Sequence, residues 1–410
     1  MKPVRIIIAG AGGGRGAWFV REVAKNPQFQ IAALVEDIPA TAEVAAREAE
    51  LSDTPVFEDT REALGKVDCD ALLVALPDGD HVEPVISALQ LGKHVYVEKP
   101  LAITTRDCLK IIEADREAGG KTLVGFNLRF APFYTSVHEA IRAGEIGDVL
   151  TIQADEFYVG GNTYFRRWNR LRKFGGGLWI TKASHDFDLL YWMAGKLPSR
   201  VTALAELSYY VPKPEAGERC RECPIESECL DSALKGWETF PDSFKEILVL
   251  REAAGWQWDL CLFNSDKDTF DHGQAIVEFE DGVFGCYTVN VVSSISDRRM
   301  RVSGTEGMCE GNLRAGDMTL WKRCGDEPEK RVLVEGDVAG HGGGDELIMD
   351  NFAAFVRGEP ARVTSPAEAS VAIATGEAAT MASDNRRVVE MREVPRWMEC
   401  ARLLADEMDR

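Results

Sequence analysis

The chain has 410 residues, which indicates two domains, and its 45% hydrophobic and 28% charged residues exclude a chain that is disordered throughout. The 47 Lys+Arg against 67 Asp+Glu leave a formal charge of −20, which disfavours nucleic acid and anionic lipid as partners. No run approaches the roughly 20 apolar residues of a membrane helix, no secretory leader is apparent, and ten Cys are too few for a disulfide scaffold. We therefore expect a cytoplasmic protein.

Strands and helices alternate in the first part of the chain. Apolar runs typical of buried strands lie at Val4–Ala9, Ile31–Val35, Ala71–Leu76, His94–Val97 and Lys121–Phe126. Helical stretches are expected at Ala17–Lys25, Thr41–Ala49 and Val82–Leu91, and between Thr104, a helix cap, and Ala118. This alternation predicts an α/β domain with a doubly wound parallel sheet over residues 1–126.

The pattern changes after residue 126. Longer alternating segments, typical of strands with one exposed face, lie at Thr151–Val159, Val201–Tyr210, Ala275–Glu280 and Val283–Val292. Helices are expected at Pro132–Ala143, Trp179–Met193, Glu346–Arg357 and Ser365–Ala382. Residues 127–410 are therefore predicted to form an α+β domain with an open, mainly antiparallel sheet, interrupted near 212–270 by an insertion that contains cysteines.

A glycine-rich turn follows the first strand. Gly10, Gly12 and Gly16 are spaced as GxGxxxG, and such a turn lets backbone N–H groups approach a pyrophosphate at a helix N-terminus. A tight structural turn is the alternative. Glu36 ends the second strand, where a carboxylate would accept hydrogen bonds from a ribose diol and repel a 2′-phosphate. We predict NAD binding, with NADP less favoured; a solvated turn is the other interpretation of Glu36.

From this point the chain resembles the glucose-fructose oxidoreductase/inositol dehydrogenase/MocA (Gfo/Idh/MocA) family. The matching stretches are DALLVALPDGDHVEPVISALQLGKHVYVEKPLA, GFNLRFAPFY, RAGEIGDV, FGGGLWITKASHDFDLLYWMAG and GHGGGDELIMDNFAAFV. The resemblance implies an N-terminal Rossmann domain, a C-terminal sheet whose open face oligomerises, and hydride transfer at a carbinol carbon of a sugar or cyclitol. A homodimer or homotetramer is expected.

The glycine turn and the resemblance together place the site residues. Expected cofactor contacts are Gly10, Gly12, Gly13, Gly14, Arg15, Glu36, Pro77, His81, Glu98, Lys99 and Asn127. Expected substrate contacts are Arg129, Thr181, Asp186 and His341.

Lys99 and His185 are the expected catalytic residues, together with Lys182. Lys99 follows a parallel strand, and open α/β sheets bind ligands at that end; its ammonium could orient a hydroxyl, although a solvated lysine is the simpler interpretation. His185 lies in a helical stretch and could accept the carbinol proton, although a histidine there is often structural.

The chain departs from the family's commonest pattern just before this histidine. That pattern has Asp four residues earlier, where this chain has Thr181. Lys182 lies three residues before His185 and could join Lys99 in polarising the substrate, or could form an exposed pair with Asp186.

Cys220, Cys223 and Cys229 are close enough in sequence to bind one metal ion. Structural zinc with a fourth ligand from Cys261, His272 or another chain, unligated thiols or a disulfide, and an iron–sulfur cluster all fit this spacing.

The sequence therefore predicts an NAD-dependent dehydrogenase that acts on a secondary hydroxyl of a sugar, cyclitol or glycoside. A redox-neutral lyase or glycosidase that oxidises its substrate transiently with NAD is the alternative. A non-catalytic nicotinamide-binding regulator is a third class, which Lys99 and His185 disfavour.

Overall fold

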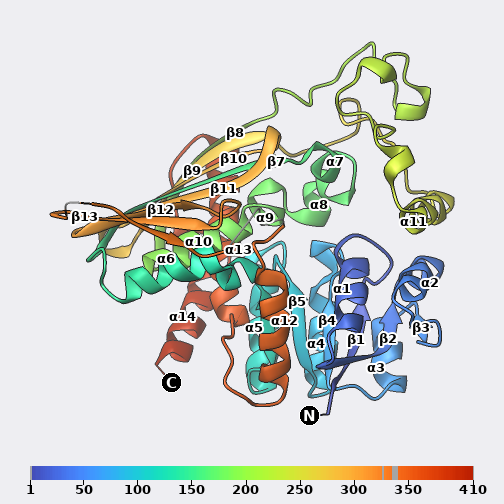
Figure 1. The fold of residues 1–410 in the computed structure, drawn as a ribbon, viewed down its shortest axis with the longest axis horizontal. Coiled ribbons are helices and arrows are strands. Elements are labelled where there is room, and N and C mark those ends of the chain that lie inside the picture. Colours follow the sequence, from blue (N-terminus) through green and yellow to red (C-terminus); the bar gives the residue numbers. More distant parts are fainter. Residues whose placement is uncertain (1, 326, 335–339, 410) are drawn as a thin grey trace.

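The structure is a computed structural model that describes residues 2–325, 327–334 and 340–409. Met1 and Arg410, the outer ends of the two predicted domain ranges, lie outside the described residues. In Figure 1 the strands and helices of residues 1–126 lie in the lower part of the molecule, and the open sheet that follows lies above them.

Six parallel strands form the first sheet, in the order β3-β2-β1-β4-β5-β6. Their bounds are β1 Val4–Ala9, β2 Phe29–Val35, β3 Val56–Phe57, β4 Ala71–Val74, β5 His94–Glu98 and β6 Thr122–Gly125. From Ile6 to Ala9 every side chain of β1 is fully buried, because helices cover both faces of the sheet. The predicted doubly wound sheet is confirmed; β3, with only two residues, carried no apolar pattern that could reveal it.

The helices that connect these strands cover the two faces. They are α1 Gly14–Lys25, α2 Pro39–Glu48, α3 Thr60–Lys66, α4 Val82–Gln90 and α5 Thr105–Glu117. The Thr104 hydroxyl caps α5 by accepting the Asp107 N–H, as predicted.

A helix from late in the chain also packs on the first sheet (Figure 1). This is α12, Gly344–Val356. Phe352 of α12 packs edge-on against Tyr96, with 5.6 Å between ring centroids, and stacks on Phe29 at 6.5 Å. The first sheet therefore takes part of its hydrophobic core from the second half of the chain.

The second sheet has nine strands, in the order β14-β13-β12-β11-β7-β10-β9-β8-β15. Their bounds are β7 Val149–Val159, β8 Pro198–Glu206, β9 His272–Phe279, β10 Phe284–Asn290, β11 Val292–Gly304, β12 Gly307–Asn312, β13 Asp317–Lys322, β14 Glu329–Val332 and β15 Val389–Glu390. All neighbours are antiparallel except β7 and β10, which confirms the mainly antiparallel prediction.

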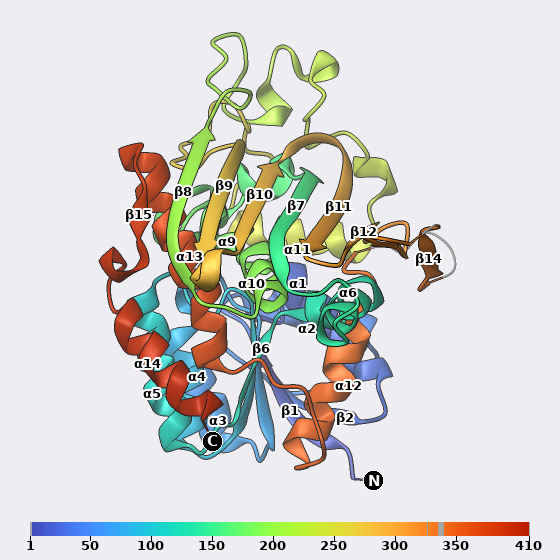
Figure 2. The ribbon, with the colours of Figure 1, turned by 90° about the vertical axis from the view of Figure 1, so that its left-hand side faces the viewer.

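Helices lie on one face of this sheet (Figure 2). They are α6 Pro132–Arg142, α7 Gly161–Tyr164, α8 Arg172–Gly175, α9 Leu178–Thr181, α10 Ser184–Ala194, α13 Pro366–Asn385 and α14 Trp397–Met408. The opposite face carries Leu204, Ile276 and Phe284, which are 64%, 47% and 45% exposed. No helix among the described residues is long and apolar enough to cross a membrane.

Two predicted elements differ from the structure. The expected strand Val201–Tyr210 ends at Glu206, and the N–H groups of Tyr209 and Tyr210 donate to the Asp271 carboxylate instead. The expected helix Trp179–Met193 is broken at Lys182 and Ala183, where the Ala183 N–H bonds the Leu178 carbonyl five residues back.

Residues 212–270 leave the second sheet between β8 and β9 and contain α11, Asp242–Ala253. Figure 1 shows this segment reaching over the first domain, with α11 beside α2. Arg47 of α2 pairs with Glu246 of α11 at 2.5 Å. The insertion therefore contacts both halves of the protein.

Candidate active site

A cavity of about 1330 Å³ lies between the carboxyl ends of the parallel strands and the second sheet. Open α/β sheets bind their ligands at this edge. The predicted site residues that line it are Gly10, Gly13, Arg15, Glu36, Pro77, Glu98, Lys99, Thr181, Lys182, His185 and His341. The fold thus brings residues from both domains to one space.

The glycine turn is held close to its neighbours. Gly10 has φ +86°, and a Cβ on it would lie 2.5 Å from the Ala75 carbonyl oxygen. A Cβ on Gly16 would lie 1.7 Å from the Gly10 carbonyl oxygen. Only glycine fits either position. Gly13, which directly precedes the first residue of α1, lines the cavity, so the N-terminus of this helix lies at the cavity edge. This cradle fits a dinucleotide pyrophosphate.

Glu36 is buried at the end of β2. Its Oε2 accepts the Gly12 N–H at 2.6 Å, and its Oε1 lies 3.4 Å from a guanidinium nitrogen of Arg251 in the insertion. Burial and a hydrogen bond with Asp37 raise the pKa of Glu36 to about 7, against the opposing effects of Arg251 and the Gly12 N–H. Glu36 therefore lines the cavity at the carboxyl end of β2.

An ion-pair chain joins the glycine turn to the start of α12. Arg15 donates to Glu98 Oε1 at 3.1 Å and also pairs with Asp345. His341 Nδ1 lies 2.9 Å from the other carboxylate oxygen of Asp345. Burial opposes ionisation of Asp345, but His341 and Arg15 hold its pKa well below the usual range.

Lys99 and Asp78 both line the cavity. Lys99 Nζ donates to the Thr181 carbonyl oxygen at 2.9 Å. Burial lowers the pKa of Lys99, and Asp78 partly opposes that effect. Burial also raises the pKa of Asp78 to about 7, against stabilisation of its charge by Lys99 and the Thr181 hydroxyl. A carboxyl group with a pKa near 7 can exchange a proton with a substrate hydroxyl at neutral pH.

His185 is 2% exposed, and neither of its ring nitrogens has a hydrogen-bond partner among the described residues. Its ring centroid lies 5.5 Å from that of His341. Burial, with the nearby cations of Lys99 and Arg298, lowers the pKa of His185 well below its ordinary value. A neutral imidazole that lines the cavity with an unused nitrogen can act as a proton acceptor.

Lys182 lies at the break between α9 and α10, so it does not share one continuous helix face with His185. Its Nζ pairs with Glu156 at 2.5 Å and lies 3.9 Å from the Tyr158 ring centroid. The exposed pair with Asp186 does not form. Lys182 is instead buried, because Glu156 neutralises its charge.

Several charged residues of the site were missed from the sequence: Asp78, Glu156, Arg167, Arg251 and Arg298. Glu156 and Arg298 are register partners on β7 and β11 and pair at 2.7 Å. The sequence of neither strand reveals which residue of the other strand lies opposite. Asp78 follows Pro77 at the end of β4, so the strand-end rule that identified Lys99 could have found it.

Four expected contact residues, His81, Asn127, Arg129 and Asp186, are not among the residues that line this cavity. Both ring nitrogens of His81 bond backbone carbonyls, and the Asn127 amide donates to Asp345. Arg129 is held by Asp188 at 2.7 and 2.8 Å and by Glu368.

Asp186 pairs with Arg298 at 2.5 Å. Buried charges need such partners. Asn127 Oδ1 and Asp186 Oδ2 are nevertheless buried without a hydrogen-bond partner among the described residues. Gly12 and Gly14 are not at the cavity surface either, since Gly12 lies against Glu36 and Gly14 against Arg167.

Cys220, Cys223 and Cys229 meet Cys261 around a separate cavity of about 20 Å³ in the insertion. All four are free thiols. Cys220 Sγ accepts the Ala233 N–H at 3.4 Å, and Cys223 Sγ accepts the Gly217 N–H at 3.3 Å. Among the described residues, no three His, Cys, Asp or Glu side chains are grouped as metal ligands, so the geometry lends no support to zinc or a cluster.

Comparison with known proteins agrees with this architecture. Residues 4–126 match the model of an oxidoreductase family with an NAD-binding Rossmann fold, and residues 138–391 match the C-terminal α/β domain of that family. The oxidoreductase YteT of Bacillus subtilis is 28% identical over 402 residues, which cover 90% of this chain and 93% of YteT.

Two further proteins are similar to this chain. Inositol 2-dehydrogenase of Rhizobium meliloti is 32% identical over 200 residues, which cover 47% of this chain and 56% of that enzyme. The fold is also that of scyllo-inositol dehydrogenase from Lactobacillus casei with bound NAD(H) and scyllo-inositol. The two structures have a TM-score of 0.70 and 19% sequence identity, and the match covers 95% of this chain and 100% of that enzyme. Both matched domains together span most of the chain, and it belongs to the Gfo/Idh/MocA oxidoreductase family.

Proposed function

We propose that this protein is an NAD-dependent dehydrogenase that oxidises a secondary hydroxyl of a sugar, cyclitol or glycoside in the cytoplasm. The observation that carries the proposal is His185, which lines the same cavity as Lys99 and the glycine turn and whose two buried ring nitrogens have no hydrogen-bond partner among the described residues. The names of the inositol dehydrogenases among its relatives support this substrate class.

The chemistry divides between two groups. Bound nicotinamide supplies the hydride acceptor. Lys99 donates a hydrogen bond to the substrate hydroxyl and stabilises the negative charge that develops on its oxygen. His185 accepts the hydroxyl proton, while the hydrogen on the carbinol carbon leaves with its electron pair, so the C–O bond becomes a carbonyl. In the reverse direction His185 returns that proton.

Residues around this pair hold the geometry. The Thr181 carbonyl fixes Lys99, and Glu156 holds Lys182 beside the Tyr158 ring. The lining of the cavity is rich in charged side chains, which suits a ligand with many hydroxyl groups. Thr181, Lys182 and His341 are the proposed substrate contacts. NAD is the proposed cofactor because the Glu36 carboxylate disfavours a 2′-phosphate.

A substrate screen tests the proposal. Purified protein with NAD is offered inositols, aldoses and glycosides in turn, while NADH absorbance and product formation are followed together. Net NADH with a ketone product is the expected result. Product without NADH accumulation would instead support the redox-neutral lyase or glycosidase, and NAD binding without turnover of any of these classes would support a regulator.

The open face of the second sheet is the proposed contact between subunits, in a homodimer or homotetramer. Leu204, Ile276 and Phe284 make this face apolar, and exposed apolar patches of sheets commonly mark interfaces.

A further inference from the structure

We propose that Arg167 and Arg251, which belong to the second domain and its insertion, bind the pyrophosphate of the dinucleotide against the glycine turn. This inference rests on the proposed use of NAD and adds a second wall to its binding site. It would make the insertion a part of the cofactor site rather than a peripheral loop.

Both guanidiniums lie directly over the turn. A Cβ placed on Gly13 would lie 2.9 Å from an Arg251 terminal nitrogen and 3.1 Å from its Nε, so this guanidinium lies across the turn. A Cβ placed on Gly14 would lie 2.9 Å from an Arg167 terminal nitrogen. Both arginines line the main cavity. Together with the open N–H groups at the start of α1, they surround the position of a bound phosphate.

Within the protein these two guanidiniums have few partners. The Arg167 side chain forms no hydrogen bond or ion pair with any other described residue. One terminal nitrogen of Arg251 pairs with Glu36 at 3.4 Å, but its Nε is buried without a partner among the described residues. Buried polar groups without partners are costly, so a pair of this kind implies an anionic ligand.

The two arginines also repel each other in the ligand-free protein. Burial lowers the pKa of Arg167, and the Arg251 charge lowers it further. An anion bound between the two guanidiniums would offset their repulsion. It would also accept hydrogen bonds from their free N–H groups. A planar guanidinium suits phosphate oxygens better than a lysine ammonium does.

The insertion holds Arg251 in place from both ends of α11. Toward its start, Glu246 pairs with Arg47 of α2. Toward its end, Glu252 pairs with Arg219 and Arg221.

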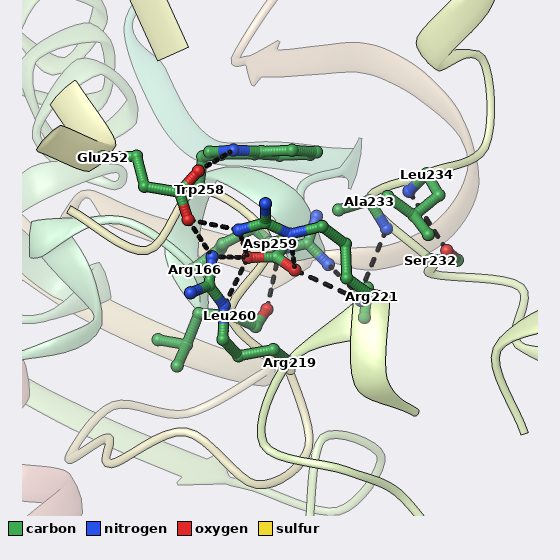
Figure 3. Close-up of polar contacts among 11 residues, drawn as sticks. Arg166, Arg219, Arg221, Ser232, Ala233, Leu234, Glu252, Trp258, Asp259 and Leu260 are labelled. Carbon is green, nitrogen blue, oxygen red and sulfur yellow. Dashed lines mark hydrogen bonds and ion pairs between the residues drawn. The ribbon is translucent and has the colours of Figure 1, made fainter. Parts of the chain in front are cut away.

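Both of these arginines also bind Asp259, with Nε to oxygen distances of 2.7 and 3.0 Å (Figure 3). Asp259 is fully buried. Glu252 adjoins Arg251 in sequence, so this ion-pair cluster fixes the end of α11 that carries Arg251.

Titration calorimetry with three probes tests the assignment: NADH, ADP and adenosine. Arg167→Met and Arg251→Met should each weaken NADH and ADP binding about tenfold, because each removes a charge-assisted contact to phosphate. Adenosine affinity should change less than twofold, since adenosine carries no phosphate. Arg172→Met, which removes an arginine outside the cavity, is the control.

A second variant separates loss of the guanidinium from movement of α11. Glu246→Ala removes the ion pair with Arg47 while keeping Arg251, so it should affect NADH binding less than Arg251→Met does. Equal losses in these two variants would show that α11, and not its arginine, supports binding, and would overturn the assignment of Arg251.

The other outcomes are distinct. Wild-type protein that fails to bind NADH would refute the proposed function itself. Wild-type binding with unchanged affinity in both arginine variants would refute only this inference. Tighter NADH binding in the variants would show that the guanidiniums block the turn.

Discussion

The Lys99 ammonium of the first domain donates to the Thr181 carbonyl oxygen of the second domain over 2.9 Å. This bond joins the carboxyl end of β5 to the break between α9 and α10, four residues before His185. The two proposed catalytic residues are therefore placed relative to each other by a contact between domains.

We expect Lys99→Ala and His185→Ala each to lower turnover by about 10²-fold or more, while NAD affinity stays nearly unchanged. Steady-state kinetics with the identified substrate and NADH titration measure the two effects separately. Matched controls are His138→Asn, which alters a ring stacked on Trp192, and Lys196→Ala, which removes an exposed ion pair. Near-normal turnover in His185→Ala would show that another group accepts the proton.

Lys182→Ala should lower turnover less than Lys99→Ala does. The Lys182 ammonium is 2.5 Å from Glu156, so part of its charge is already neutralised before substrate binds. Thr181→Asp added to Lys182→Ala should partly restore turnover, because it returns the family's commonest acidic residue. Turnover lower in the double variant than in Lys182→Ala would contradict that role for position 181.

The acid limb of kcat/KM should lie below pH 6.5. Burial and neighbouring cations lower the pKa of His185, so the neutral, proton-accepting form persists to more acidic pH than for a solvated histidine. A pH profile of kcat/KM measures this limb. Burial raises the pKa of Asp78 to about 7, so this carboxyl could produce a limb of its own in the profile. A limb that disappears in Asp78→Asn would be assigned to Asp78. A limb above 6.5 that persists in Asp78→Asn would contradict the lowered His185 pKa.

NAD should bind at least tenfold tighter than NADP at pH 8, about 1.4 kcal/mol, because the ionised Glu36 repels a 2′-phosphate. Burial raises the pKa of Glu36 to about 7, so this carboxyl becomes neutral as pH falls through 7 and the preference should narrow. Glu36→Ser should narrow the preference for NAD over NADP at every pH. Glu43→Ser, which changes an exposed residue of α2, should not. Equal dissociation constants for wild-type protein at pH 8 would refute the prediction.

Thiol labelling should distinguish the interpretations of the cysteine group. In a Cys324→Ser background, which removes an exposed thiol, Cys223 and Cys229 should react before the buried Cys220 and Cys261. Burial also raises the pKa of the Cys220 thiol, which slows its reaction. Mass spectrometry of labelled peptides gives the order. If all four thiols are protected from labelling and a chelator removes this protection, a bound metal would be supported instead.

Ile276→Asp should reduce the proposed oligomer to smaller species, since it places a charge in the centre of the apolar open face. Sedimentation velocity measures the change. Met398→Asp alters an apolar residue on α14 that is even more exposed, and it should leave the mass unchanged. A monomeric wild type, or identical masses for all three proteins, would remove this face as the subunit contact.

The sequence alone was sufficient for the features that depend on local pattern. The strand, glycine turn and helix around Gly10 are encoded by adjacent residues, and steric contact allows only glycine at Gly10 and Gly16. Lys99 was identified because the end of a parallel strand can be read from the run that precedes it. His185 was identified from the resemblance and its helical context.

Tertiary structure decided the features that join distant parts of the chain. Arg251 and Glu36 are 215 positions apart, and Arg298 and Asp186 are 112 apart. No local periodicity encodes such pairs, because they depend on strand register and on how an insertion folds back over the first domain. The same limit applies to Arg129, which the sequence predicts as a substrate contact and which pairs with Asp188 and Glu368 in the structure. A buried guanidinium requires nearby carboxylates, and only the fold determines where those lie.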